Sequence, residues 1–170
     1  MLTIKLVRIG ILVLGGLACS LLQAQTVPVA ISVTVLKTPK EKHPTPQSAP
    51  APVSEDRLLE IVLKSSNSQT LTNLEVKYWL LVRDVTSKDV TIAVMDSSTL
   101  TLRPFIQGVV TSSVAKCDYT PRTAGTPKPV PAKGSKFYGY GVQVLEGGKI
   151  ASQTYEPTDA QSVIKGDAKK

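Results

Sequence analysis

Residues 73–84 read NLEVKYWLLVRD, and this stretch decides the fold of the 170-residue chain. Its apolar side chains recur at every second position, at Leu74, Val76, Tyr78, Leu80 and Val82. Successive side chains of a β-strand point to opposite faces, so a period of two predicts a strand with one buried face and disfavours a helix.

Shorter stretches of the same kind lie on both sides of this one. Alternation and β-branched residues predict strands over residues 27–36, 57–65, 89–95, 99–102, 107–119, 136–145 and 150–155. Polar residues 67–70 and 96–98 predict turns, and the paired glycines at 147–148 are typical of a hairpin. A short helix over residues 158–164, capped by Thr158 or Asp159, is also expected. Seven or eight short strands without a long helix predict an all-β, immunoglobulin-like antiparallel sandwich.

The first 24 residues have the features of a secretory signal peptide. Lys5 and Arg8 supply a positive start, and the apolar core at residues 9–17 is too short to span a bilayer. Cleavage is expected after residues 22–24, which read Leu-Gln-Ala. The sequence therefore predicts an exported protein that is secreted or periplasmic. A location at the cell surface is a further alternative.

Two alternatives to a cleaved leader stay open. The leader is retained as a membrane anchor in one, and Cys19 is acylated in the other, because residues 16–19 (Gly-Leu-Ala-Cys) approach a lipobox. The second alternative predicts an outer-membrane lipoprotein. With cleavage, residues 25–157 form the sandwich, residues 158–170 form a tail, and no transmembrane segment is expected to remain.

Two proline-rich segments are predicted as long loops inside the sandwich, at residues 37–55 and 120–135. The first has five prolines, and its composition favours an extended, solvated conformation. Residues 121–131 of the second have four prolines, and bases lie in and beside them at Arg122, Lys128 and Lys133. This basic loop is a candidate contact for anionic surface polymers, with Lys128 and Lys133 as candidate binding residues.

Charge and cysteine content exclude several classes of protein. The formal charge of +7 falls to 18 − 13 = +5 when the two bases of the leader are removed, and the charges are interleaved rather than clustered. No basic run with interleaved aromatics is present, so we expect no nucleic-acid partner. Cys117 is the only thiol left after cleavage, and it is predicted to be a small core residue on a strand. A reactive thiol or an intermolecular disulfide at Cys117 remains an alternative.

Catalytic and metal sites are not indicated. The chain has one histidine, His43, and it lies in the first proline-rich segment. A catalytic triad needs a histidine held beside its nucleophile, and a zinc site needs several histidines or cysteines. A calcium site at Asp84, Asp89 or Asp96 is an alternative without a matching loop pattern. We therefore expect no enzyme activity and no cofactor.

Trp79 is the most informative single residue, because it shares a strand face with Leu81 opposite the main apolar set. In one interpretation a bulge turns the indole into the core. In the other, Trp79 and Leu81 lie on the outer face, across the glycine backbone at Gly139 and Gly141, and part of the indole stays exposed. Exposed aromatics anchor interfaces, so Trp79 and Leu81 are candidate binding residues.

Two stretches carry a resemblance to a known kind of module. They are LEIVLKSSNSQTLTNLEVKYWLLVRD (residues 59–84) and FYGYGVQVLEGGKIASQTYEP (residues 137–157). They resemble FxLYD-type immunoglobulin-like domains of bacterial extracytoplasmic proteins. Residues 27–156 are also similar to small secreted immunoglobulin-like proteins of Verrucomicrobia that are linked to type IV pili. The two proline-rich insertions and the absence of a pilin leader depart from those patterns, which argues against a pilin subunit.

This resemblance implies a non-catalytic module that binds protein or has a structural role in the bacterial envelope. The implied partner is an envelope protein, and the pilus machinery is one candidate. The alternatives are a carbohydrate-binding module, which needs an exposed aromatic platform, and a lipid-anchored envelope protein. No catalytic residue carries over from such modules.

Overall fold

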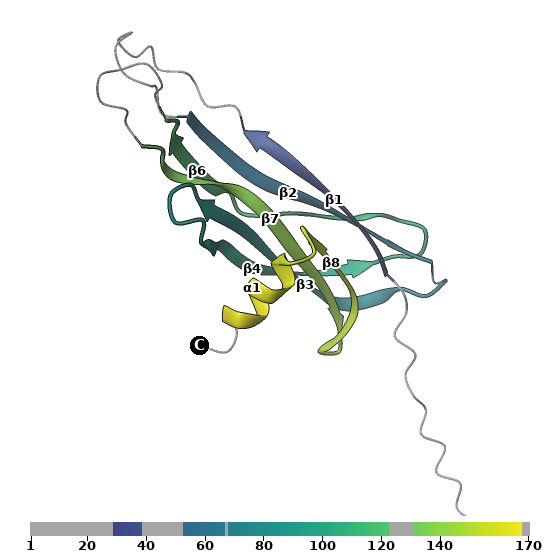
Figure 1. The fold of residues 1–170 in the computed structure, drawn as a ribbon. Coiled ribbons are helices and arrows are strands. Elements are labelled where there is room, and N and C mark those ends of the chain that lie inside the picture. The colour runs from purple at the N-terminus through teal and green to yellow at the C-terminus, as the bar shows by residue number, and fades with distance from the viewer. Residues whose placement is uncertain (1–28, 39–52, 67, 123–130, 168–170) are drawn as a thin grey trace, which may run out of the picture.

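The structure is a computed structural model that describes residues 29–38, 53–66, 68–122 and 131–167 (Figure 1). Most of the first proline-rich segment with His43, and the part of the second that holds Lys128, lie outside the described residues. Within these ranges the chain forms eight strands and one helix: β1 (Val29–Thr38), β2 (Val53–Ser65), β3 (Leu71–Asp84), β4 (Val90–Leu102), β5 (Gly108–Thr111), β6 (Ala115–Thr120), β7 (Lys133–Glu146), β8 (Lys149–Glu156) and α1 (Ala160–Asp167).

The strands form two facing layers in which every pairing between described strands is antiparallel (Figure 1). In one layer β2 pairs with β1 on one side and with β5 and β6 on the other. The other layer has the order β4-β3-β7-β8. The layers join where the start of β7 pairs with the end of β6 at Tyr119 and Thr120. This arrangement confirms the expected immunoglobulin-like sandwich with a short C-terminal helix.

The alternating face of β3 forms the centre of the core, as the sequence predicts. Leu74, Val76 and Leu80 are fully buried, and Tyr78 is nearly so. They pack in one cluster with Leu59, Ile61 and Leu63 of β2 and with alternate residues of β7. Burial of such a side chain stabilises the fold by about 1.5–3 kcal/mol. The two inner faces therefore hold the layers together.

Cys117 lies in β6 and is buried, which confirms its predicted place in the core. Burial raises the pKa of its thiol, because the thiolate would lose hydration. The cysteine is thus held in its neutral form inside the sandwich.

The turn predicted at residues 96–98 is wrong, because β4 continues through it as one strand of 13 residues. Asp96, Ser97 and Ser98 pair with Tyr78, Lys77 and Val76 of β3. The Tyr78 hydroxyl also donates a hydrogen bond to the Asp96 carboxylate at 3.3 Å. Pairing with a strongly β-forming strand overrides the local preference of Asp and Ser for turns.

The single strand predicted over residues 107–119 is interrupted at residues 112–114, which leaves β5 and β6 on either side. Both pieces pair with β2. At the break, Ser112 donates its N–H to the Leu59 carbonyl at 2.9 Å, and its hydroxyl accepts the Leu59 N–H at 2.8 Å. The buried serine hydroxyl thus takes the place of a ladder hydrogen bond.

The connection between β4 and β5 is a tight turn with an aromatic residue at its third position. Ile106 donates its N–H to the Arg103 carbonyl at 3.3 Å, and Phe105 between them has a φ of 61°. Proline at the second position (Pro104) and a positive φ at the third are features of a type II turn, in which glycine is favoured at the third position. A residue other than glycine costs about 1–2 kcal/mol in the left-handed region.

The strand registers define two ends of the sandwich. At one end β1 finishes, β3 finishes and β7 begins, since Thr38 pairs with Asp56 and Asp84 pairs with Ser135. At the opposite end Val29 pairs with Ser65, where β1 begins and β2 finishes. The helix α1 lies outside the sandwich, on the layer that contains β3 and β7 (Figure 1). None of the helical structure in the described ranges combines the length and apolar character needed to cross a bilayer.

Candidate functional site

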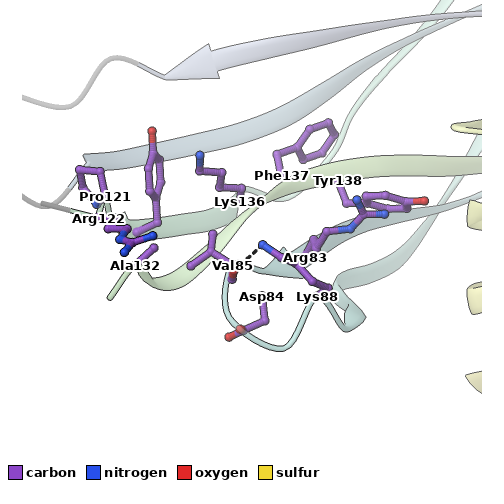
Figure 2. Close-up of a pocket in the computed structure, with 11 residues that line it drawn as sticks. Arg83, Asp84, Val85, Lys88, Pro121, Arg122, Ala132, Lys136, Phe137 and Tyr138 are labelled. Atoms are coloured by element: carbon purple, nitrogen blue, oxygen red, sulfur yellow. Dashed lines mark hydrogen bonds between the residues drawn. The ribbon is translucent and has the colours of Figure 1, made fainter. Parts of the chain in front are cut away.

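A cavity of about 450 Å³ opens at the end of the sandwich where β3 finishes and β7 begins (Figure 2). Its size is in the range of small-ligand sites. Three segments form its wall, namely the end of β3 with the turn after it, the end of β6, and the start of β7. The lining residues are Arg83, Asp84, Val85, Lys88, Tyr119, Pro121, Arg122, Ala132, Lys136, Phe137 and Tyr138.

The turn between β3 and β4 is tied to the segment that leads into β7. Val85 donates its N–H to the Gly134 carbonyl at 2.9 Å, and the Thr86 hydroxyl donates to the Ala132 carbonyl at 3.0 Å. Gly134 has a φ of 101°, and a Cβ there would lie 2.2 Å from the Asp118 carbonyl oxygen. A glycine is therefore needed where β7 passes β6, and the cavity depends on this close approach.

Asp84 holds the turn through its side chain. Its Oδ1 accepts the backbone N–H groups of Thr86 at 2.7 Å and Ser87 at 2.9 Å. These two hydrogen bonds lower the pKa of the Asp84 carboxyl, because they stabilise its charged form. The bond from Ser87 has the larger effect. The carboxylate is thus used within the turn, and in Figure 2 it points away from Lys136 and Arg122.

Four cationic side chains, Arg83, Lys88, Arg122 and Lys136, line the cavity. The Arg83 guanidinium carbon lies 4.0 Å from the ring centre of Tyr138, and the Lys136 ammonium lies 4.0 Å from that of Tyr119. Lys88 donates from Nζ to the Val85 carbonyl at 2.6 Å (Figure 2). Within the described ranges, no carboxylate forms an ion pair with any of the four.

The wall of the cavity therefore has four positive charges and one carboxylate that is already hydrogen-bonded. The aromatic faces of Tyr119 and Tyr138 hold the cations in place rather than remaining open. An arrangement of this kind attracts an anionic group, which would receive charge-assisted hydrogen bonds from the guanidinium and ammonium groups.

Tyr138 links this cavity to the C-terminal helix. Its hydroxyl donates to the Asp159 carboxylate at 2.5 Å, just before α1 begins. This bond is the first cause of a raised pKa at Tyr138, since it stabilises the protonated phenol. Asp159, predicted as a helix cap, thus accepts a tyrosine hydroxyl from β7. The helix starts two residues later than predicted, at Ala160, and extends to Asp167.

Trp79 and Leu81 lie away from the cavity, on the outer face of β3, beneath α1. They form a second apolar cluster with Ala160 and Ile164 of the helix. Trp79 is 8% exposed and Leu81 is fully buried, so the alternative in which part of the indole stays exposed is wrong. The alternative in which a bulge turns the indole into the core is also wrong, because Trp79 packs in this outer cluster and not between the layers. The helix covers the face that the sequence left open.

Gly139 and Gly141 are the reason that the C-terminal segment can cover this face. Gly141 pairs with Trp79, and Gly139 pairs with Leu81, which confirms that their strands are neighbours. A Cβ on Gly141 would lie 2.5 Å from Ile164 Cδ1, and one on Gly139 would lie 2.0 Å from the Glu156 carbonyl oxygen. The space over the bare glycine backbone is therefore filled by Ile164 of α1 and by residues 155–157 before the helix.

The candidate binding residues of the basic loop are only partly described. Lys133 begins β7 and is exposed beside Ala132, but it does not line the cavity. Lys128 lies outside the described residues. Arg122, a base of the same loop, does line the cavity.

Sequence reasoning missed Arg83, Lys88 and Lys136. Arg83 closes the strongest strand and Lys136 opens a late one, but only the β3–β7 pairing brings them together, as neighbours in the register. The alternative of a calcium site receives no support, because no group of three His, Cys, Asp or Glu side chains suited to a metal occurs in the described part of the chain.

Comparisons with known proteins add little to this geometry. No family model matches the chain, and no curated protein matches it. A solved structure described as target SoR45 of the Northeast Structural Genomics Consortium is similar over 76% of this chain and 88% of that one. The sequence identity is 16% and the TM-score is 0.36, and that description states no activity.

Proposed function

We propose that this protein is an exported, non-catalytic binding module of the bacterial envelope that holds an acidic segment of a protein partner in its cation-lined cavity. One observation carries the proposal: Arg83, Lys88, Arg122 and Lys136 meet around a single cavity, and among the described residues none of the four forms an ion pair. The four positive charges come from three separate segments and repel one another. A bound anion would offset this electrostatic repulsion, which is present in the free protein.

Several features favour an acidic peptide over a sugar. Carbohydrate-binding modules use open aromatic faces, but the rings of Tyr119 and Tyr138 lie under Lys136 and Arg83. Trp79, the single tryptophan of the chain, lies beneath α1 and is not open to a sugar. An acidic peptide instead presents separate carboxylates, which suit cations spaced around a cavity.

The same wall supports a binding role rather than catalysis. Its described residues include no serine, cysteine or histidine, so it lacks the usual nucleophile and general base. Asp84 accepts two backbone hydrogen bonds in its turn, and Cys117 is buried in the core. The cavity chemistry is suited to attracting charge.

The envelope location rests on the first 24 residues, which have the features of an export signal. The resemblance to secreted immunoglobulin-like proteins linked to type IV pili makes a component of the pilus machinery one candidate partner. Acylation at Cys19 would place the same module on a membrane and would leave its cavity unchanged.

Titration calorimetry of the exported protein with a ten-residue glutamate-rich peptide tests the proposal. Lys136→Glu and Arg122→Glu should each weaken binding at least tenfold, which corresponds to about 1.4 kcal/mol. Lys149→Glu, in the exposed hairpin between β7 and β8, makes the same change in net charge and serves as the matched control. Pull-down from envelope extract with the wild type and Lys136→Glu then identifies the natural partner.

Equal weakening by Lys149→Glu would mean that only net charge matters, and would contradict a site at the cavity. Binding of an acidic polysaccharide without any binding of the peptide would contradict the protein partner.

A further inference from the structure

We propose that the turn between β4 and β5 docks the protein onto a lipid bilayer by inserting Phe105 and Ile106 into its interface. These two residues, with Val109 of the following strand, are called the apolar tip. Phe105 is 86% exposed, Ile106 is 56% exposed and Val109 is 58% exposed. Three large apolar side chains so close in sequence and so open to water mark an interaction surface.

The backbone at Phe105 gives a second reason to assign the tip a role outside the domain. Its φ of 61° is one that glycine adopts without strain and that a phenylalanine adopts at a cost. The exposed ring contributes little to the core in return. Strained positions of this kind occur at ligand-binding and switching sites. The turn therefore presents an aromatic side chain where the fold alone would favour none.

The position of the apolar tip in the fold indicates that it binds a membrane. Gly108 pairs with Leu63, and β5 is antiparallel to β2, so the residues before Gly108 continue toward Ser65. Val29, where the described chain begins, pairs with Ser65. The tip thus lies at the end of the sandwich to which the leader is joined.

The leader is the part of the chain that engages a membrane during export. Cys19 precedes Val29 by 29 − 19 = 10 residues, which reach at most about 35 Å. An acyl group at Cys19, or a retained leader, would hold this end of the domain close to the bilayer. After cleavage, the tip alone would give a weaker, reversible contact.

Basic residues beside the tip favour an anionic bilayer surface. Arg103 is exposed at the start of the turn, and Lys64 is exposed on β2 next to Leu63, the partner of Gly108. Aromatic and aliphatic side chains flanked by bases are typical of segments that lie in the headgroup region.

A domain docked in this way would present the cation-lined cavity away from the bilayer, because the cavity lies at the other end of the sandwich. The 13 residues of β2 run between the two ends, a distance of about 40 Å. The geometry is that of a module that stands on a membrane and faces a partner beyond it.

Sedimentation with vesicles of phosphatidylglycerol and phosphatidylethanolamine tests the proposal, with the exported protein in its mature form. The wild type should sediment with the vesicles, and Phe105→Gly combined with Ile106→Ser should reduce the bound fraction at least fivefold. Met95→Ser is the matched control, because Met95 is 70% exposed on β4 away from the tip, and it should bind as the wild type does. Both variants should still bind the glutamate-rich peptide, which separates this proposal from the cavity.

Tryptophan fluorescence gives a second measurement. Trp79 is the only tryptophan and is buried, so Phe105→Trp adds a reporter at the tip. Its emission should shift to shorter wavelength when vesicles are added. Absence of vesicle binding by the wild type, or equal binding by the tip variant, would overturn the proposal. So would a lipid-free dimer that dissociates on Phe105→Gly, since the tip would then bind a second copy of the chain.

Discussion

Trp79 lies directly opposite Gly141 in the register of β3 and β7, and the space above Gly141 that a side chain would fill is taken by Ile164 of α1. The absence of one side chain thus lets the helix reach the sheet. The indole, the glycine and the helix form one packed unit on the outside of the sandwich.

Gly141→Ala should loosen α1. The added methyl group would lie 2.5 Å from Ile164 Cδ1 and 2.9 Å from the ring of Tyr155. Overpacking of this kind costs about 1–3 kcal/mol, which urea unfolding would measure. Emission of the single tryptophan should also shift to longer wavelength as the indole meets water. Gly166→Ala, in α1 with open space around it, is the control and should leave emission unchanged.

Phe105→Gly should make the domain more stable. It relieves the positive φ at the third position of the turn and gives up almost no buried surface, so a gain of about 1 kcal/mol in the free energy of unfolding is expected. Denaturant unfolding measures this gain. Gln107→Gly, two residues further on, has no positive φ to relieve and should lower stability instead. A loss of stability on Phe105→Gly would contradict the strained turn.

Asp84→Ala should lower the thermal midpoint in a pH-dependent way. The carboxylate accepts the N–H groups of Thr86 and Ser87, and its pKa lies below the ordinary value of 3.8. A lowered folded-state pKa means that its contribution is complete above about pH 4 and is lost as the pH falls through the folded value. The difference between wild type and variant should therefore be full at pH 7 and shrink below pH 4. A difference that is constant across this range would contradict the role of the charge.

Cys117 should resist thiol reagents in the folded protein and react in urea. Its side chain is 1% exposed, and burial raises its pKa, which lowers the fraction of reactive thiolate. Cys117→Ser should cost about 1–3 kcal/mol, because a hydroxyl, which is more strongly hydrated than a thiol, would have to be buried in its place. Cys117→Ala separates this polar effect from the loss of volume. Rapid labelling of the native protein would contradict the buried position.

The strands were largely predictable from the sequence. The apolar period of two in β3 and its neighbours reflects one buried face on each strand. This pattern is local, so it can be recognised without knowing how the strands are ordered in the layers. The predicted turn in β4 failed because Asp96, Ser97 and Ser98 are held by their partners on β3. The break between β5 and β6 depends on Ser112 bonding to Leu59, more than fifty residues away.

The candidate site was predictable only in part. Arg122 was visible as a base in a proline-rich loop, but Arg83 and Lys136 come from strands whose order in the sheet no local pattern specifies. The burial of Trp79 was equally out of reach, since the residues that cover it belong to α1, some eighty positions later.

By itself the sequence determined which segments are extended and which faces are apolar, because these follow from neighbouring residues and their periodicity. Only the tertiary structure decided that four cations surround one cavity, that α1 covers Trp79 and that the turn with Phe105 lies at the end of the sandwich where β1 begins. These features depend on which strands pair and in what register, and that is settled by the packing of the whole sandwich.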